Sequence, residues 1–330
     1  MTDLAAPAPR SPEDVQSCRP RTSIALARTG VTGVEKVFRL GPDGAERALF
    51  ATFECSVDLG ATQRGAHMSR FDEAVEAIAL EPVDSVDALA ARLAERVREL
   101  HAARWAEVWV RARMPQVREA PASGAAGEEM RTVLAAAVAV AGSTRRLLGV
   151  DIQGMTACPC GQAMAAAAAR ERLADEGFDD EEIERVLASV PVATHNQRGL
   201  ATLWVGPNDD LNAGGAVAPE ELIEIAELSM SSPIWELLKR PDEAHVVERA
   251  HRRPRFVEDC VREMLSMGVE RLGRLGARTY LSARQENLET IHRHKVVAER
   301  AGLLGELGEE LAGGAPAGAS PSPGDWLRSA

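Results

Sequence analysis

The sequence predicts an α+β protein in which antiparallel sheets carry helices on one face. Residues 22–40 and 46–59 have β-branched, alternating patterns, two amphipathic segments follow them, and alternation returns after Trp105. A period of two is typical of half-buried strands, and apolar residues three and four apart are typical of helices. The second half repeats this order of strands, helices and strands without a visible sequence repeat. We therefore expect two tandem modules of this kind.

The first module is predicted over residues 21–128. Asp43-Gly44 marks a hairpin turn between its first two strands. One helix is expected to begin near Ser69, and a second after Asp84 or Ser85, which are good capping residues. Residues 115–128 contain Pro and Gly and are interpreted as a long hairpin loop or a linker.

The second module is predicted over residues 129–311. Its expected elements are one or two strands in 131–157, a helical hairpin insertion at 163–190 that turns at Gly177, a strand at 200–205, helices at 220–230 and 255–267, a strand at 277–283 and a helix at 288–303. The Pro-, Gly- and Ala-rich ends, residues 1–20 and 312–330, are expected to be mobile tails.

Composition narrows the class of protein. A chain of 330 residues with 45% hydrophobic and 27% charged residues matches a soluble globular protein of about two domains. No apolar run approaches the ~20 residues that span a bilayer. The N-terminus lacks the apolar segment of a secretory signal, so we expect a cytosolic protein. Five cysteines, an odd number, then favour reduced thiols over disulfides.

The net charge of −12 argues against general nucleic-acid binding, which needs a broad basic surface. A nucleotide pocket remains compatible with it, because a few basic residues can create a local positive potential. Each short basic cluster, taken alone, is more often an ordinary solvated surface. The clusters are Arg64 with Arg70, Arg198, Lys239 with Arg240, and Arg252 with Arg253 and Arg255.

Cys158-Pro159-Cys160 is the most informative motif. Adjacent Cys-x-Cys thiols rarely form a disulfide with each other, and proline holds the bend between them. One sulfur can therefore bind a metal while the other stays free for chemistry. The competing interpretation is a strand end with two buried thiols that act as small hydrophobes. A closed structural zinc site is disfavoured, because no second Cys or His pair has suitable spacing.

Three other segments carry candidate groups. His195-Asn196-Gln197-Arg198 offers donors and acceptors suited to a purine edge and phosphates, although a lone histidine is more often structural. Glu258 flanks the apolar stripe of a predicted helix, where a guanine N1–H and 2-amino group could compensate its desolvation. Glu289 and His292 would share one face if residues 288–303 are helical, as acid–base partners, metal ligands or a simple surface pair.

Taken together, these segments resemble the prokaryotic type IB GTP cyclohydrolase family, including its archaeal methanopterin-branch relatives. The matching stretches run in order from near the start of the chain to about residue 300: Asp14-Val15-Gln16 ahead of Arg19-Pro20, and residues 64–70, 155–160, 194–199, 237–243, 256–259 and 286–292.

The resemblance implies a tunnelling fold with two modules in one chain, assembled as a homo-oligomer, a homotetramer in known members, with sites near interfaces. It also implies one divalent metal ion per site (zinc, iron(II) or manganese) and GTP as substrate, with no nucleic-acid or membrane partner. By position, the family's metal ligands fall on Cys158, His195 and Glu243. The second, catalytic thiol falls on Cys160, and further groups near the metal fall on Glu289 and His292.

Glu258 matches the purine-anchoring glutamate, and the remaining polar candidates are assigned to the substrate. These candidates are His67, Arg64, Arg70, Gln197, Arg198, Lys239 and Arg240. The implied reaction opens the imidazole ring of GTP at C8, releases formate and closes a pterin ring, giving 7,8-dihydroneopterin triphosphate for folate, pterin or deazapurine synthesis.

Two departures from the family pattern bear on the product. The stretch between Cys160 and His195 is much longer than in compact bacterial members, and Gly161-Gln162 replaces the usual polar–basic pair. The 2′,3′-cyclic phosphate is therefore an alternative product. A non-catalytic purine-binding protein of the same fold is an alternative function. A nucleoside deaminase would need His-x-Glu with Pro-Cys-x-x-Cys, and the chain has neither.

Overall fold

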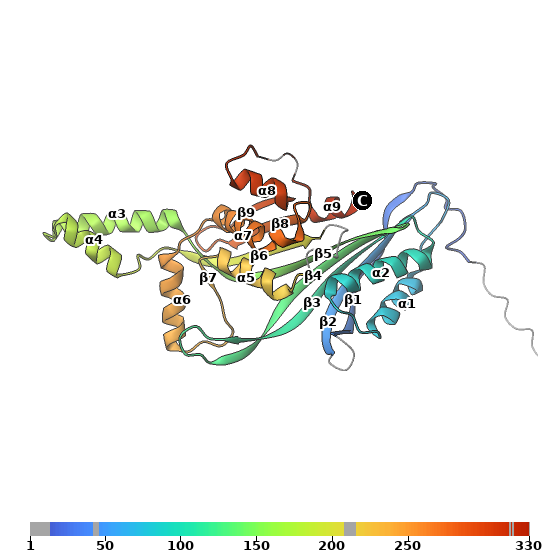
Figure 1. Ribbon diagram of the computed structural model, residues 1–330, viewed down its shortest axis with the longest axis horizontal. Coiled ribbons are helices and arrows are strands. Elements are labelled where there is room, and N and C mark those ends of the chain that lie inside the picture. Colours follow the sequence, from blue (N-terminus) through green and yellow to red (C-terminus); the bar gives the residue numbers. More distant parts are fainter. Residues whose placement is uncertain (1–13, 42–45, 208–215, 317, 319, 330) are drawn as a thin grey trace, which may run out of the picture.

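One continuous antiparallel sheet dominates the computed structural model, which describes residues 14–41, 46–207, 216–316, 318 and 320–329. Its long strands are hydrogen-bonded in the order β1–β2–β3–β4–β5–β6–β8–β9 (Figure 1). Their bounds are β1 Leu26–Leu40, β2 Arg47–Leu59, β3 Trp105–Glu119, β4 Ala126–Val140, β5 Ser143–Ala157, β6 Asn196–Gly206, β8 Tyr280–Leu288 and β9 Val296–Leu303. A short strand, β7 (Ser232–Pro233), pairs with β5.

Four helices cover one face of this sheet: α1 (Met68–Ala79), α2 (Val86–His101), α5 (Pro219–Ser229) and α7 (Val257–Leu272). Helix α2 begins where expected, since the Ser85 side chain accepts a hydrogen bond from the Ala88 amide. It ends at Ala102, which adopts the left-handed conformation at φ 48°. Alternate apolar side chains of the strands pack against the apolar sides of these helices in one large core.

The order of elements is strand, strand, helix, helix, strand, strand, and it occurs twice. Strands β1 to β4 with α1 and α2 form the first module, and β5, β6, α5, α7, β8 and β9 form the second. This confirms the predicted fold class. The boundary expected at residues 128/129 falls inside β4, and the repeat of elements divides the chain at the β4–β5 hairpin instead.

The second module carries the longer connections. Helices α3 (Pro159–Asp175) and α4 (Asp180–Ser189) form the predicted hairpin, with Gly177 at φ 89°, and this arm extends away from the sheet (Figure 1). Helix α6 (Arg240–Arg252), which was not expected, follows α5 and precedes α7 in the sequence. A 3₁₀ turn (Gly273–Leu275) and α8 (Leu304–Leu311) complete this half.

Two secondary-structure predictions are wrong. Residues 115–128 are not a loop, because β3 continues to Glu119 and β4 begins at Ala126. The helix expected over 288–303 is instead the end of β8, a connection and strand β9. Val296 to Leu303 pair with Asn287 to Tyr280, and this pairing decides the structure of a segment that local propensity leaves ambiguous. Glu289 and His292 therefore do not share a helical face.

Parts of both predicted tails are folded against the protein. Near the start, the amides of Arg64 and Gly65 donate to the carbonyl of Gln16, and Asp14 lies 3.3 Å from His67 Nε2. The Asp43-Gly44 turn and residues 1–13 lie outside the described residues. Near the end, Pro323–Arg328 form helix α9.

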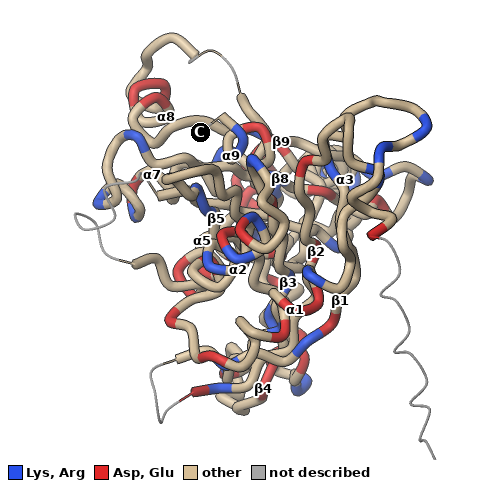
Figure 2. The backbone as a smooth tube through the Cα atoms, turned by 90° about the vertical axis from the view of Figure 1, so that its right-hand side faces the viewer, with Lys and Arg blue, Asp and Glu red and all other residues tan. Residues whose placement is uncertain are grey.

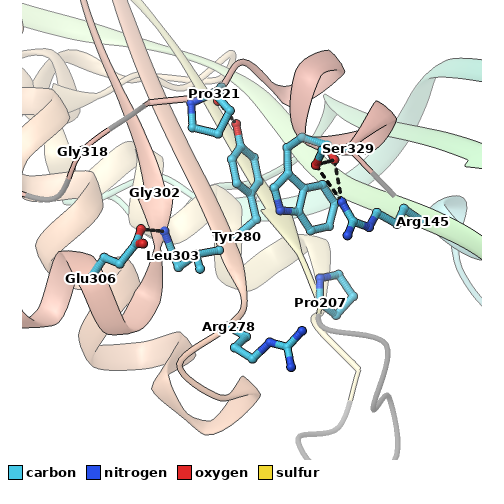
Figure 3. Close-up of a pocket in the computed structure, with 11 residues that line it drawn as sticks. Arg145, Pro207, Arg278, Tyr280, Gly302, Leu303, Glu306, Gly318, Pro321 and Ser329 are labelled. Carbon is cyan, nitrogen blue, oxygen red and sulfur yellow. Dashed lines mark hydrogen bonds between the residues drawn. The ribbon is translucent and has the colours of Figure 1, made fainter.

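Helix α9 closes a second, smaller core on the sheet face opposite α1, α2, α5 and α7. Leu134, Ala136 and Val138 of β4 belong to it, whereas their neighbours in the strand face the main core. Trp326 stacks on Tyr280 with ring centroids 4.9 Å apart, and Leu327 is fully buried. The Tyr280 hydroxyl donates a hydrogen bond to the Pro321 carbonyl, and the Arg145 guanidinium donates to the Ser329 hydroxyl (Figure 3). The C-terminal segment therefore packs as part of the sheet's cover.

Basic and acidic residues are interspersed along the elements (Figure 2). No helix among the described residues is long and apolar enough to cross a membrane.

Candidate functional site

Cys158 and His195 are neighbours where β5 ends and β6 begins. The last register pair of these strands is Ala157 with Asn196, so the next residues on each side are neighbours. The Cys158 amide donates to the His195 carbonyl over 3.1 Å. The hydroxyl of Thr194 donates to the Cys158 carbonyl over 2.8 Å. The register of β5 with β6 therefore makes neighbours of two residues that are separated in the chain by the whole α3–α4 arm.

Cys158 also caps helix α3. Its sulfur accepts a hydrogen bond from the Gly161 amide at 3.4 Å, and Pro159 occupies the first helical position. A Cβ atom at position 161 would lie 2.6 Å from Thr194 Oγ1 and 3.3 Å from His195 Cδ2. Gly161 is therefore needed for the close approach of α3 to His195.

His195 is held by polar groups on one side of its ring. Its Nδ1 lies 3.1 Å from Gln197 Oε1 and 3.9 Å from Glu289 Oε2. Glu289 follows β8 directly, and its side chain is only 8% exposed. The described residues offer no hydrogen-bond partner to His195 Nε2, so this nitrogen is available to a ligand.

Cys160 is exposed in the first turn of α3, in contrast to two other thiols. Burial raises the pKa of Cys55 and of Cys260 to about 12, which keeps both thiols protonated. His292 lies in the exposed β8–β9 connection, where its ring stacks on His294 at 5.0 Å. Cys160, unlike the buried thiols of Cys55 and Cys260, thus has the accessibility that a reacting thiol needs.

Glu243 does not join Cys158 and His195 within this chain. It is exposed in the first turn of α6, and the other end of that helix is the one near His195, because His251 Nε2 lies 3.3 Å from the Thr194 carbonyl. Eight residues of helix separate Glu243 from His251, or about 12 Å along the axis. Over the described ranges, no three His, Cys, Asp or Glu side chains are close enough to hold a metal ion together.

The start of α6 is fixed by its neighbour Asp242, which is fully buried. Its carboxylate accepts hydrogen bonds from the amides of Ala122, Ser123 and Lys239 and from the Ser123 hydroxyl, at 2.6–2.8 Å. These bonds, with desolvation opposing them, hold the pKa of Asp242 well below its usual value. The β3–β4 turn of the first module therefore clamps the helix that carries Glu243.

Glu258 is exposed in the first turn of α7, so its carboxylate is not buried at the apolar edge of the helix as the sequence predicted. The Arg255 amide, one turn earlier, donates to the Ala157 carbonyl over 2.9 Å, so α7 starts beside the Cys158 strand end. Glu258 borders a cavity of about 520 Å³ whose apolar wall includes Val261, Leu265 and Leu307.

The predicted substrate-binding residues fall into separate groups. Arg64 and His67 lie between β2 and α1, and Arg70 lies in the first turn of α1. This part of the first module is at the end of the molecule away from the α3–α4 arm (Figure 1). Lys239 and Arg240 are exposed at the start of α6. Arg198, on β6, donates to Gln153 and lines a groove of about 440 Å³. Gln197 is buried behind His195.

Several residues around the site were not expected from the sequence. Gln162 donates to the carbonyls of Val192 and His251, which ties α3 to α6. Thr156 accepts from Gln197, and Asp242 fixes α6. These contacts join segments far apart in the chain, so spacing alone could not reveal them. Only Asp242 had a local signal, as an acidic residue in a first helical turn.

Comparisons with known proteins agree with the resemblance drawn from the motifs. The family model described as type I GTP cyclohydrolase folE2 matches residues 13–298. GTP cyclohydrolase MptA of Haloferax volcanii is 40% identical over 304 residues, covering 90% of this chain and 97% of the relative. MptA of Methanocaldococcus jannaschii is 37% identical over 308 residues, with 90% and 97% covered.

Among solved structures, uricase from Arthrobacter globiformis aligns with a TM-score of 0.49 at 7% identity, over 92% of this chain and 99% of that one. The family assignment comes from the sequence matches, which extend over nearly the whole chain. This chain belongs to the type I GTP cyclohydrolase folE2 family.

Proposed function

We propose that this protein is a GTP cyclohydrolase that hydrolyses C8 of GTP, releases formate and forms 7,8-dihydroneopterin triphosphate for pterin synthesis in the cytosol. The relatives at 37–40% identity are named GTP cyclohydrolase, and the alignments cover almost their full length. The observation that supports the chemistry most directly is that Cys158 and His195 are neighbours, and that His195 Nε2 has no hydrogen-bond partner among the described residues.

The residues at this strand end suit a divalent metal ion. A thiolate and an imidazole nitrogen are ligands for zinc, iron(II) and manganese to different degrees, and the pair does not choose among them. We assign Cys158 and His195 as two ligands and Glu243 as the third. Such an ion would lower the pKa of bound water from about 15.7 toward ~7, which supplies a nucleophile at neutral pH.

Because Glu243 lies about 12 Å along α6 from the His195 end, we propose that it comes from a second copy of the chain. The homo-oligomer, with a homotetramer as the expected form, would then be required for a complete site. Exposure of Glu243, Lys239 and Arg240 on one helix start is compatible with docking against another subunit.

The chain's own side chains have distinct roles in this proposal. Cys160 transfers protons at C8 and N7 of the purine, helped by His292 and by Glu289 beside His195. Glu258 accepts hydrogen bonds from guanine N1–H and the 2-amino group, which selects guanine. Arg64, His67, Arg70, Arg198, Lys239 and Arg240 are assigned to the triphosphate, and because they lie in separate groups, they too would meet only in the oligomer.

A complementation experiment tests the shared site. Cys158→Ser and Glu243→Gln are each expected to release no formate from GTP as purified homo-oligomers. Co-expression of the two variants with different affinity tags, followed by purification of the hybrid, should restore formate release, because some interfaces combine an intact Cys158 with an intact Glu243. An inactive hybrid of normal oligomeric size would contradict the assignment of Glu243 to a second copy.

The product distinguishes the remaining alternatives. The α3–α4 arm between Cys160 and His195 is the departure that makes 7,8-dihydroneopterin 2′,3′-cyclic phosphate a second candidate product. Anaerobic incubation with GTP and mass spectrometry separates the triphosphate from the cyclic phosphate. Binding of GTP without formate under all metals tested would instead support a non-catalytic purine-binding protein.

A further inference from the structure

Gln197 lies directly behind His195 on β6, with only 5% of its surface exposed. Its side-chain oxygen faces His195 Nδ1 at 3.1 Å, and its amide nitrogen donates to Thr156 Oγ1 over 3.0 Å. Thr156 is fully buried and is the register partner of Gln197 across β5 and β6. Both polar ends of the Gln197 side chain therefore have partners inside the protein, and its burial argues against a direct contact with GTP.

His195 Nδ1 faces two acceptors, Gln197 Oε1 and Glu289 Oε2, the latter at 3.9 Å. A neutral imidazole donates from one ring nitrogen and accepts at the other. Gln197 Oε1 lies within hydrogen-bond distance and can only accept, so the ring proton belongs on Nδ1. The Glu289 carboxylate is too far away for a hydrogen bond, but its negative charge favours the same N–H. The lone pair is then on Nε2, on the side of the ring where the described residues provide no partner.

We propose that Gln197, anchored by Thr156, is a positioning residue that holds His195 with its proton on Nδ1 and so makes Nε2 the metal-binding atom. This inference rests on the proposed function and gives Gln197 a role different from the substrate contact expected from the sequence. Hydrogen-bond partners behind a metal-binding histidine fix its tautomer and orientation, and their loss weakens metal binding by about 10–100-fold.

The test measures metal affinity of the metal-free protein by competition with a chromophoric chelator, using Zn²⁺ and Mn²⁺ separately. Gln197→Met keeps the length of the side chain and removes the acceptor, so we expect about 10–100-fold weaker binding. Thr156→Val removes only the anchor of Gln197 and should weaken binding in the same direction by a smaller factor. It is also the milder variant if Gln197→Met does not fold.

Gln285→Met is the matched control. Gln285 is a fully buried glutamine on β8 whose amide donates to Asn287, and no contact with His195 is present in the described part of the chain. It should keep the wild-type affinity, with all variants compared at equal α+β content by circular dichroism. If Gln285→Met weakens metal binding as much as Gln197→Met does, the loss of affinity comes from disturbed packing in general, and the proposal is overturned.

The outcomes separate the two proposals. If wild-type protein binds the metal, His195→Ala abolishes binding and Gln197→Met binds as tightly as wild type, the positioning role is wrong and the metal centre stands. If wild-type protein and His195→Ala bind metal equally poorly, the metal centre itself is wrong, and the inference falls with it.

Discussion

The two modules have the same order of elements and differ in their connections. In the first module, residues 41–46 join β1 to β2, and residues 80–85 join α1 to α2. In the second, residues 158–195 and 230–256 occupy the corresponding places and include the α3–α4 arm and α6. Cys158, Cys160, His195 and Glu243 all lie on these two long connections. The sheet and its four helices thus act as a scaffold, and the proposed chemistry is built on what the second module adds to it.

The histidines illustrate the same contrast. His101 of the first module packs on Phe71, and its ring nitrogens lie 3.0 Å from the Val97 carbonyl and 3.2 Å from the His67 carbonyl. Burial lowers the pKa of His101. His195 of the second module instead has a partner at Nδ1 and none at Nε2 among the residues that the structure describes. A histidine bonded on both sides is structural, and one bonded on a single side is available to a ligand.

The modules are also joined by buried charges. Arg118 and Arg131 of the first module form ion pairs of 2.8–3.1 Å with Glu129 and with Glu227 of α5. Burial raises the pKa of Glu227, and the two arginines oppose that shift. Arg118 also donates to the Ile234 carbonyl, at the start of the connection that leads to α6. The first module therefore contributes to the site indirectly, by holding this connection in place.

The largest effect is expected at Cys160, which tests whether the second module's exposed thiol differs in function from the first module's buried one. Cys160→Ala should lower formate release by about 10²–10⁴-fold, because it removes a proton-transfer group. Metal content and GTP binding should be unchanged. Cys55→Ala is the control in the first module and should retain formate release. Normal turnover by Cys160→Ala would exclude a proton-transfer role for this thiol.

Alanine substitutions of Gly161 in the second module and Gly60 in the first compare the connections of the two modules directly. Gly161→Ala places a Cβ 2.6 Å from Thr194 Oγ1 and close to His195, so α3 or His195 must move. Displacements near 1 Å can reduce rates by about 10²-fold, and we expect kcat/KM to fall by about 10–100-fold. Gly60→Ala, in the first module, meets nothing within 4 Å and should have wild-type kinetics. Equal kinetics for both variants would show that the close approach at Gly161 is not needed.

The C-terminal strap, helix α9 (Pro323–Arg328), links both modules without touching the proposed site. Leu327 is fully buried, and Arg328 reaches Glu107 of the first module at 3.0 Å. Leu327→Ala should lower the free energy of unfolding by about 2–5 kcal/mol, as expected for a large-to-small change in a core. Formate release at low temperature should remain normal. Chemical denaturation measures the first effect, and a loss of turnover without a loss of stability would link α9 to catalysis.

The smallest effect concerns Asp242, the point where the first module clamps α6. Its pKa is lowered in the folded protein, so its ionised form stabilises folding above the usual aspartate pKa near 3.8. That stabilisation is lost as the pH falls through the lower, folded-state value. The stability difference between wild type and Asp242→Asn should therefore be constant from pH 5 to 7 and shrink below about pH 4. Asp179, which caps the exposed helix α4, provides the control variant Asp179→Asn. A stability difference between wild type and Asp242→Asn that stays the same down to pH 2 would contradict the clamp.

Local patterns predicted much of the fold. The helical spacing after Ser85 and the alternation after Trp105 each identify an element by themselves, because propensity and burial agree there. Strand β9 was missed, because residues 288–303 suit either a helix or a strand and only pairing with β8 decides between them. The same limit applies to α6 and α9. The packing of α6 depends on Ala122 and Ser123, and that of α9 depends on Tyr280, and these partners are far away in the chain.

The site could be predicted in its residue types and only partly in its geometry. The motif at residues 158–160 pointed to a thiol site, but its closeness to His195 depends on the register of β5 with β6. The role of Gln197 depends on which face of β6 it occupies, which no motif states. Glu243 was assigned to the same site, and the structure puts it at the far end of α6, so position in a motif did not establish proximity.

The central claim is that Cys158 of the second module's long connection binds a catalytic metal ion. X-ray absorption at the metal edge of the purified protein tests it most directly. A sulfur scatterer at about 2.3 Å is expected for zinc in wild type and in Cys160→Ser, and it should disappear in Cys158→Ser. A sulfur shell that survives in Cys158→Ser, or is absent from the wild-type metal centre, would contradict the account.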